Sequence, residues 1–158
     1  MTKTSPGTAN VRLGISAIAL AILFNVPFSV LGAIYDYPDI LRRPAGEALS
    51  RFAEGGPALI FTWYGFALAA LALAPLAIGL SITRERLAER PALVIGAAVA
   101  GALAGMTQAI GLLRWVFVIP GLARDYASGT PDAQAAAERA FDLLNAMAAS
   151  RSASIWGS

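Results

Sequence analysis

The sequence predicts an all-α membrane protein with three transmembrane helices. Apolar runs cover about residues 11–35, 57–82 and 91–120. Each run exceeds the ~20 residues that a helix needs to cross a hydrocarbon core of ~30 Å. Apolar residues make up 57 % of the 158 residues and charged residues only 14 %, whereas soluble domains contain about 25 % charged residues. Arg114 is the only charged residue placed deeply within these runs.

The three predicted spans differ in the residues that they carry. Asn25 lies near the middle of the first span, and Pro27 should weaken or kink its helix, because proline lacks the N–H and clashes with the preceding turn. Trp63 and Tyr64 lie near the start of the second span, where amphipathic aromatic side chains favour the headgroup level. The third run would measure ~48 Å as one helix, so it must tilt, protrude or break, and Pro120 marks its predicted end.

The segments outside the spans complete a single helical membrane domain over residues 1–158. We predict a flexible leader at 1–10 and a flexible tail at 150–158. Residues 44–54 alternate apolar and charged positions at helical spacing, which predicts either a short interfacial helix or a helical loop packed on the bundle. Residues 83–90 form a charged turn, and residues 131–148 predict an amphipathic helix that is too short and too charged to span.

The residues that the chain lacks restrict its chemistry. It contains no cysteine and no histidine, so we predict no metal site, no cofactor and no catalytic residue, because the usual thiolate and imidazole groups are missing. The net charge of +2 is small and dispersed, which argues against nucleic-acid binding. The first run is too long for a signal-peptide core of ~7–15 residues, so we expect a retained helix.

Basic residues predict the orientation. Lys3, Arg12, Arg84, Arg86 and Arg90 flank the spans on one side of the membrane. The loop on the opposite side contains three arginines together with several acidic residues. Because Lys and Arg accumulate in short cytoplasmic flanks, we expect a cytoplasmic N-terminus.

A ladder of small residues follows the third span. Its members stand four residues apart: Ala97, Gly101, Gly105 and Ala109. Small side chains let two helix backbones approach closely. The ladder is therefore either a helix-packing face inside one bundle, which is the more frequent case, or the interface of a homo-oligomer.

A few polar residues lie within the spans. Asn25 and Gln108 are both near mid-depth and could form a hydrogen bond with each other, as interhelical contacts or as part of a ligand site. Arg114 is expected at the same end as Asp36. It could form an ion pair with Asp36, extend to the headgroups beside Trp115, or bind an anionic lipid or ligand.

Four stretches of the chain resemble a family of uncharacterised bacterial multi-pass integral membrane proteins, a domain of unknown function. They are residues 37–42 (YPDILR), the pair Trp63-Tyr64, residues 111–120 (GLLRWVFVIP), and residues 135–141 (AAAERAF) with Asn145. The resemblance implies an all-helical protein of the bacterial cytoplasmic (inner) membrane, and it brings no activity. The resemblance implies that members of this family continue into further spans, so we expect this chain to be a C-terminally shortened relative or one rebuilt for a different role.

Three functional hypotheses follow. The first is a non-catalytic membrane subunit that packs against lipids, partner helices or a larger membrane complex. The second is a component of an oligomeric transporter or channel, whose polar face would consist of Asn25, Thr107 and Gln108. The third is a membrane enzyme, which would depend on loop carboxylates such as Asp36 and Asp39 and is the least supported.

Overall fold

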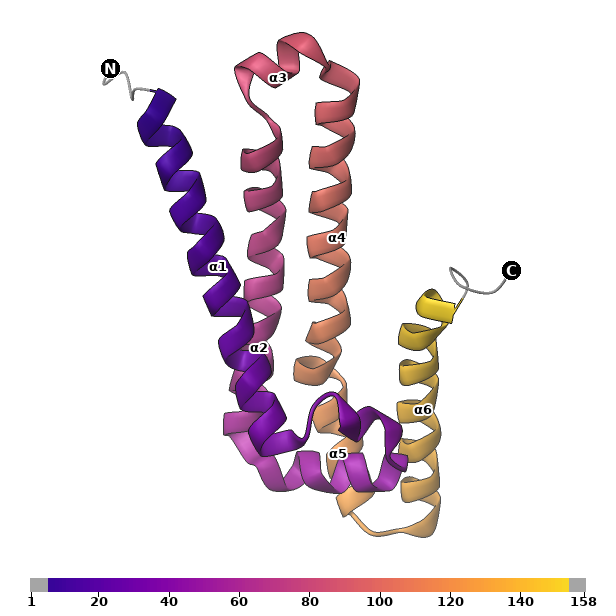
Figure 1. Cartoon of the computed structure of the whole chain (residues 1–158). Coiled ribbons are helices and arrows are strands. Elements are labelled where there is room, and N and C mark those ends of the chain that lie inside the picture. The colour runs from indigo at the N-terminus through magenta and orange to yellow at the C-terminus, as the bar shows by residue number, and fades with distance from the viewer. Residues whose placement is uncertain (1–5, 154–158) are drawn as a thin grey trace. The chain divides into compact units, whose positions relative to one another are not determined.

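The computed structural model describes residues 6–153, and the side chains of residues 11–147 within them. The described part of the chain is helical and contains no strand (Figure 1). Its elements are α1 (Pro6–Tyr35), the 3₁₀ helix η1 (Asp39–Arg42), α2 (Ala45–Ser81), α3 (Arg84–Glu89), α4 (Pro91–Phe117), α5 (Ile119–Ala127) and α6 (Pro131–Ala153). Three segments are long and apolar enough to cross a membrane: Val11–Tyr35, Ala45–Ser81 and Pro91–Ala127. The all-α class with three candidate spans is thus confirmed.

Helical structure extends into both of the end segments that were predicted to be flexible. Helix α1 begins at Pro6, so residues 6–10 of the predicted leader are helical, and residues 1–5 lie outside the described part. Helix α6 continues to Ala153, and residues 154–158 of the predicted tail lie outside the described part. The helices continue because proline is compatible with a first helical turn and because residues 149–153 contain no helix-breaking residue.

The predicted interfacial helix and the second span are two sections of α2 that meet at a kink. Gly56 has φ 57° and ψ −155°, which interrupts the helical geometry. Glycine adopts positive φ without a steric penalty because it has no Cβ. Pro57 follows and contributes no N–H to the helix. The pair therefore lets the chain turn between a charged section and an apolar section.

The long third run breaks, as its length requires. Helix α4 ends at Phe117 and α5 begins at Ile119, with Val118 between them. Pro120 lies in the first turn of α5, where its missing N–H costs no hydrogen bond. The break therefore falls two residues before the predicted end.

The contacts of the chain divide it into two compact units. Unit 1 contains residues 1–27 and 65–110, which include most of α1, the second part of α2, α3 and most of α4. Within it, α2 and α4 are antiparallel and joined through α3 (Figure 1). Phe24 of α1 contacts Phe66 of α2 with ring centroids 4.7 Å apart. Unit 1 is therefore a bundle of three long helical segments.

Helices α2 and α4 approach each other closely at two glycines. A Cβ atom placed on Gly101 would lie 2.5 Å from the Cβ of Ala77. One placed on Gly105 would lie 2.9 Å from the backbone nitrogen of Ala74 and 3.2 Å from the backbone oxygen of Ala70. The glycines of the predicted ladder therefore pack inside this chain.

The other two members of the ladder behave differently from each other. Ala109 is buried, whereas Ala97 is exposed and Ala98 is buried in its place. A helix has 3.6 residues per turn, so positions four apart drift by about 40° at each step. A strict four-residue ladder therefore leaves the contact face after a few turns.

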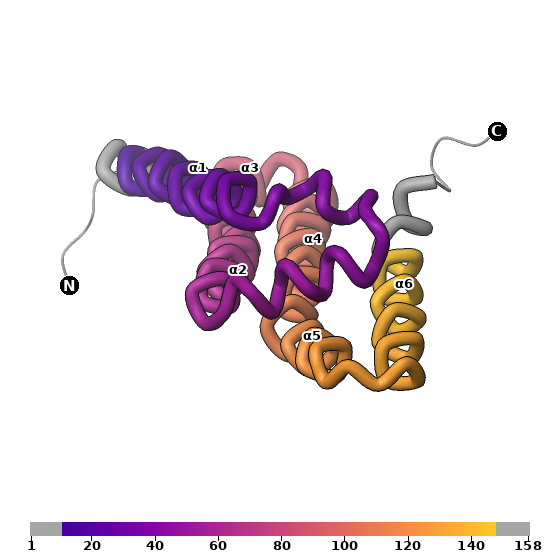
Figure 2. The backbone as a smooth tube through the Cα atoms, turned by 90° about the horizontal axis from the view of Figure 1, so that it is seen from below, coloured from indigo at the N-terminus to yellow at the C-terminus, as the bar shows by residue number. Residues whose placement is uncertain are grey.

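Unit 2 contains residues 28–64 and 111–158. It includes the end of α1, η1, the first part of α2, the end of α4, α5 and α6. Helices α5 and α6 pack against each other and are joined by the short connection at 128–130 (Figure 2). Its buried core is rich in aromatic side chains.

Replacing Gly105 by alanine is expected to destabilise the protein by about 1–3 kcal/mol, because the new methyl group would press against the backbone of α2. Gly96→Ala is the matched control, since a Cβ there meets nothing within 4 Å and alanine favours the helix by about 0.5–1 kcal/mol. Thermal unfolding in mild detergent measures both. Equal effects of the two substitutions would contradict the close approach at Gly105.

Candidate functional site

Five buried aromatic residues from four helices meet in unit 2, and we call them the aromatic cluster. They are Tyr35 from α1, Phe52 and Trp63 from α2, Trp115 from α4 and Phe141 from α6. Each is at most 2 % exposed. Because the members come from distant parts of the sequence, the cluster joins α1, α2, α4 and α6 at one place.

Trp115 is the centre of the aromatic cluster. Its ring stacks on that of Trp63 with centroids 4.6 Å apart and an interplanar angle of 6°. Tyr35 and Phe141 approach Trp115 edge-on, with centroids at 5.6 Å and 6.0 Å. Phe52 stacks at 5.9 Å. Aromatic pairs contribute roughly 0.5–1.5 kcal/mol each beyond area burial, so this arrangement strongly favours one packing of the helices.

The one hydroxyl of the cluster is satisfied within it. The Tyr35 hydroxyl donates a hydrogen bond to the backbone oxygen of Ala48 at 3.0 Å, in a buried position. A buried hydroxyl without an acceptor would be costly. This hydrogen bond ties the last turn of α1 to the first section of α2.

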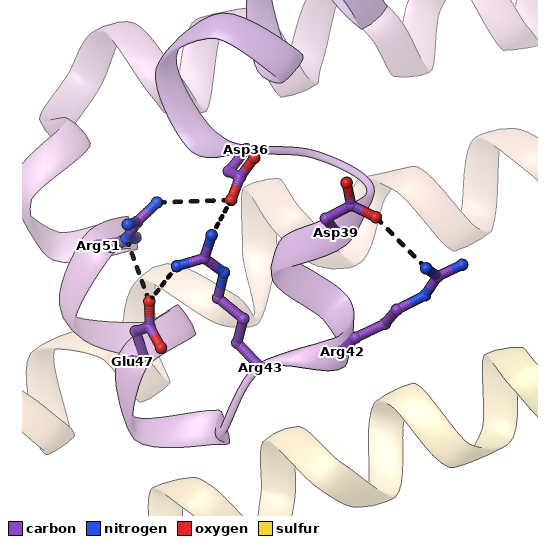
Figure 3. A network of polar contacts seen from close by, with 6 residues as sticks. All are labelled: Asp36, Asp39, Arg42, Arg43, Glu47 and Arg51. Atoms are coloured by element: carbon purple, nitrogen blue, oxygen red, sulfur yellow. Dashed lines mark hydrogen bonds and ion pairs between the residues drawn. The ribbon is translucent and has the colours of Figure 1, made fainter.

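Four charged residues form a second cluster, the ion-pair network of Asp36, Arg43, Glu47 and Arg51 (Figure 3). Arg43 donates hydrogen bonds to both Asp36 and Glu47, the latter at 2.6 Å. Arg51 lies 3.5 Å from the Glu47 carboxylate and 3.9 Å from that of Asp36. The hydrogen bond to Glu47 is the main reason that the pKa of Arg43 rises above its ordinary value. The network balances two acidic residues against two basic ones.

The backbone after α1 places Asp36 in this network. Asp36 has φ 58°, in the left-handed region that aspartate tolerates better than most residues. Its backbone oxygen accepts a hydrogen bond from the N–H of Ile40 at 2.9 Å, which starts the turn into η1. Ile40 itself is fully buried. The turn therefore directs the chain toward Arg43 and the start of α2.

Arg114 does not pair with Asp36, so of the three alternatives for Arg114 the ion pair is not formed. Its guanidinium donates a hydrogen bond to the backbone oxygen of Leu144 in α6 at 2.7 Å and lies 5.4 Å from the ring centroid of Trp115. Asp36 is already engaged by Arg43 and Arg51. Arg114 is half-buried, and its Nε is buried without a hydrogen-bond partner. Its observed role is to connect α4 with α6.

Tyr37 lies beside the aromatic cluster. Its ring meets Trp63 edge-on, with centroids 5.0 Å apart. Burial raises the pKa of the Tyr37 hydroxyl above its ordinary value, and the positive charge of Arg114 partly offsets this rise. The hydroxyl therefore stays neutral at physiological pH.

The predicted hydrogen bond between Asn25 and Gln108 is not present. The Asn25 amide donates instead to the backbone oxygen of Ala21 in its own helix, at 2.8 Å. Asparagine can bond to the carbonyl four residues earlier, so the Nδ2 of Asn25 finds an acceptor within its own helix. Gln108 is exposed on α4.

The sequence prediction missed the aromatic cluster. It expected Trp63 and Tyr64 at the headgroup level and did not foresee that Trp63 is fully buried against Trp115, while Tyr64 is 42 % exposed. The sequence did contain one indication of this cluster, because Tyr35, Trp63 and Trp115 all lie at predicted span ends on the same side of the membrane. Stacking between the two indoles could not be deduced from position alone.

No metal centre is evident in the described part of the chain, where no group of three or more histidine, cysteine, aspartate or glutamate side chains could hold an ion. The fold defines a multi-helix membrane protein with three helical segments long and apolar enough to cross a membrane. A family profile described as "Domain of unknown function (DUF4386)" matches residues 12–157. The chain therefore belongs to this family. No curated protein and no solved structure matches the chain.

Trp115→Ala is expected to destabilise the protein by about 3 kcal/mol or more, because truncation empties the centre of the aromatic cluster. Phe117→Ala on the same helix is the control, since Phe117 is 71 % exposed and such positions change stability by about 0.5 kcal/mol or less. Thermal unfolding followed by near-UV circular dichroism in detergent measures both. Similar losses for the two variants would contradict the central role of Trp115.

Proposed function

We propose that this protein is a non-catalytic integral membrane subunit that packs against partner helices or a larger membrane complex. The observation that carries this proposal is how little the spans cover one another. Within the most apolar 18-residue window of α2, 39 % is buried inside the chain. The corresponding share is only 22 % for the Pro91–Ala127 segment and 11 % for α1. Much of α1 and α4 is therefore free to contact lipid or other helices.

One uncovered side of α4 suits a partner helix, and we call it the small-residue face. Its members are Gly96, Ala100, Ala104, Thr107 and Gln108, all of them exposed. Small side chains allow close helix approach. The amide of Gln108 would be costly in hydrocarbon without a hydrogen-bond partner, and a second helix can supply one. This combination supports a protein partner over lipid alone.

The alternative is a component of an oligomeric transporter or channel. Thr107 and Gln108 are adjacent on the small-residue face, and polar groups at this depth can mark a transport pathway. One copy provides only these two polar side chains on that face. A polar pathway would therefore require several copies around a common axis.

We assign the protein to the bacterial cytoplasmic membrane with its N-terminus in the cytoplasm, on the support of the basic residues around α3 and at the start of α1. Three spans then place the C-terminus outside the cytoplasm. A C-terminal reporter that is active only in the cytoplasm should be inactive. An active reporter would reverse this orientation.

The partner face can be tested directly because the chain has no cysteine. Ala104→Cys, alkylated at its thiol with a maleimide that carries a photoreactive group, should give an efficient cross-link in native membranes on illumination. Met106→Cys treated in the same way should not, since the two positions lie about 200° apart on the helix. Ala104→Phe should disrupt the complex measured by size in mild detergent, and Met106→Phe should leave it intact.

The identity of the cross-linked species separates the hypotheses. A covalent pair with a second protein of defined stoichiometry supports the subunit. A covalent pair of two copies favours the oligomeric transporter or channel. Equal cross-linking at both positions, or a monomer that binds nothing, would contradict the proposed partner face.

A further inference from the structure

An apolar groove opens between α2 and α4 in unit 1. It has a volume of about 230 Å³ and is lined by Ile78, Ile82, Ile95, Ala98, Val99 and Ala102. Ile78 lies in the last turn of α2, Ile82 follows the end of α2, and the other four residues lie in the first half of α4. Helices α2 and α4 are joined at this end through α3 (Figure 1). Every lining side chain is apolar, so the groove suits hydrocarbon.

Three exposed arginines stand at the end of this groove, and we call them the basic turn: Arg84, Arg86 and Arg90. Arg84 follows Ile82 by two residues. Arg86 donates a hydrogen bond to the backbone oxygen of Leu80 at 3.0 Å, which holds it against the end of α2. The guanidinium groups of the basic turn therefore lie next to an apolar groove, at the end of two spans.

The arginines of the basic turn differ from those of the ion-pair network. Arg43 and Arg51 are both held by carboxylates. In contrast, no described carboxylate lies within ion-pair distance of the basic turn, although Glu85 and Glu89 are in the same segment. The positive charge of the basic turn is therefore available to an external anion.

The start of α1 adds to this charge. Leu13 of α1 lies against Gly79 of α2, where a Cβ on the glycine would be 3.1 Å from the leucine side chain. Arg12 precedes Leu13 and is exposed. A fourth basic residue therefore lies at the same end of unit 1.

We propose that the groove and the basic turn bind one anionic phospholipid, with an acyl chain in the groove and the headgroup phosphate against Arg84 and Arg90. A phospholipid is the occupant that combines an acyl chain at membrane depth with an anion at the interface. Basic pockets between spans bind anionic headgroups in this manner. A zwitterionic lipid fills the groove equally well but gains less from the arginines.

The test is native mass spectrometry of the full-length protein in detergent, titrated with dioleoyl phosphatidylglycerol or dioleoyl phosphatidylcholine. The anionic lipid should bind at least about tenfold more tightly. The double substitution Arg84→Gln and Arg90→Gln should lower its affinity roughly 25-fold, from a contribution of about fivefold per arginine, and should lower the affinity for phosphatidylcholine much less. Arg42→Gln with Arg139→Gln removes the same charge elsewhere and should change neither affinity.

The groove itself is tested by filling it. Ala102→Phe should weaken both lipids, and Val99→Phe provides a second groove-filling variant at a more exposed position. Equal affinities of the wild-type protein for the two lipids would overturn the proposal. Equal losses of phosphatidylglycerol affinity in the two double-arginine variants would also overturn it. So would unchanged lipid affinity in a groove-filled variant that still folds.

Discussion

The stack of Trp63 on Trp115 is the contact on which the arrangement of unit 2 depends. Lipid tails are as apolar as the side chains that face them, so hydrophobic burial drives helices together only weakly inside a membrane. Shape and ring geometry then decide which helices meet. The two indoles lie flat against each other, and Tyr35 and Phe141 close the edges. Four helices are thereby held at one point without a buried ion pair.

The charged residues of the chain are placed in three different kinds of surroundings. Between α1 and α2, acidic and basic residues neutralise one another in the ion-pair network, and the positive φ of Asp36 helps to place its carboxylate there. In the basic turn, the arginines lack such partners. Arg114 is a third case, because it is half-buried and bonds to a backbone oxygen. The first arrangement contributes to structure, whereas the second leaves charge for contacts outside the chain.

Much of the fold could be predicted from the sequence, and much less of the candidate site. The helices around residues 11–35, 57–82 and 91–120 follow from apolar runs that are long enough to cross the hydrocarbon core of a membrane. The pairing of side chains does not follow in the same way. Depth along a span can be counted from the sequence, but the direction in which a side chain points around the helix axis depends on neighbouring helices. This is why the sequence did not reveal that Asn25 bonds to the backbone oxygen of Ala21, or that Asp36 pairs with Arg43.

The sequence by itself determined that this is a helical membrane protein, where its spans lie, and that its glycines at 101 and 105 suit close packing. These properties depend on local composition and spacing, which act through the bilayer thickness and the helix period. Only the tertiary structure decided that Trp63 faces Trp115 and that Arg114 reaches α6. It also decided that the basic turn stays unpaired beside an apolar groove. Such contacts join residues far apart in the chain, so they depend on how whole helices pack and not on any local signal.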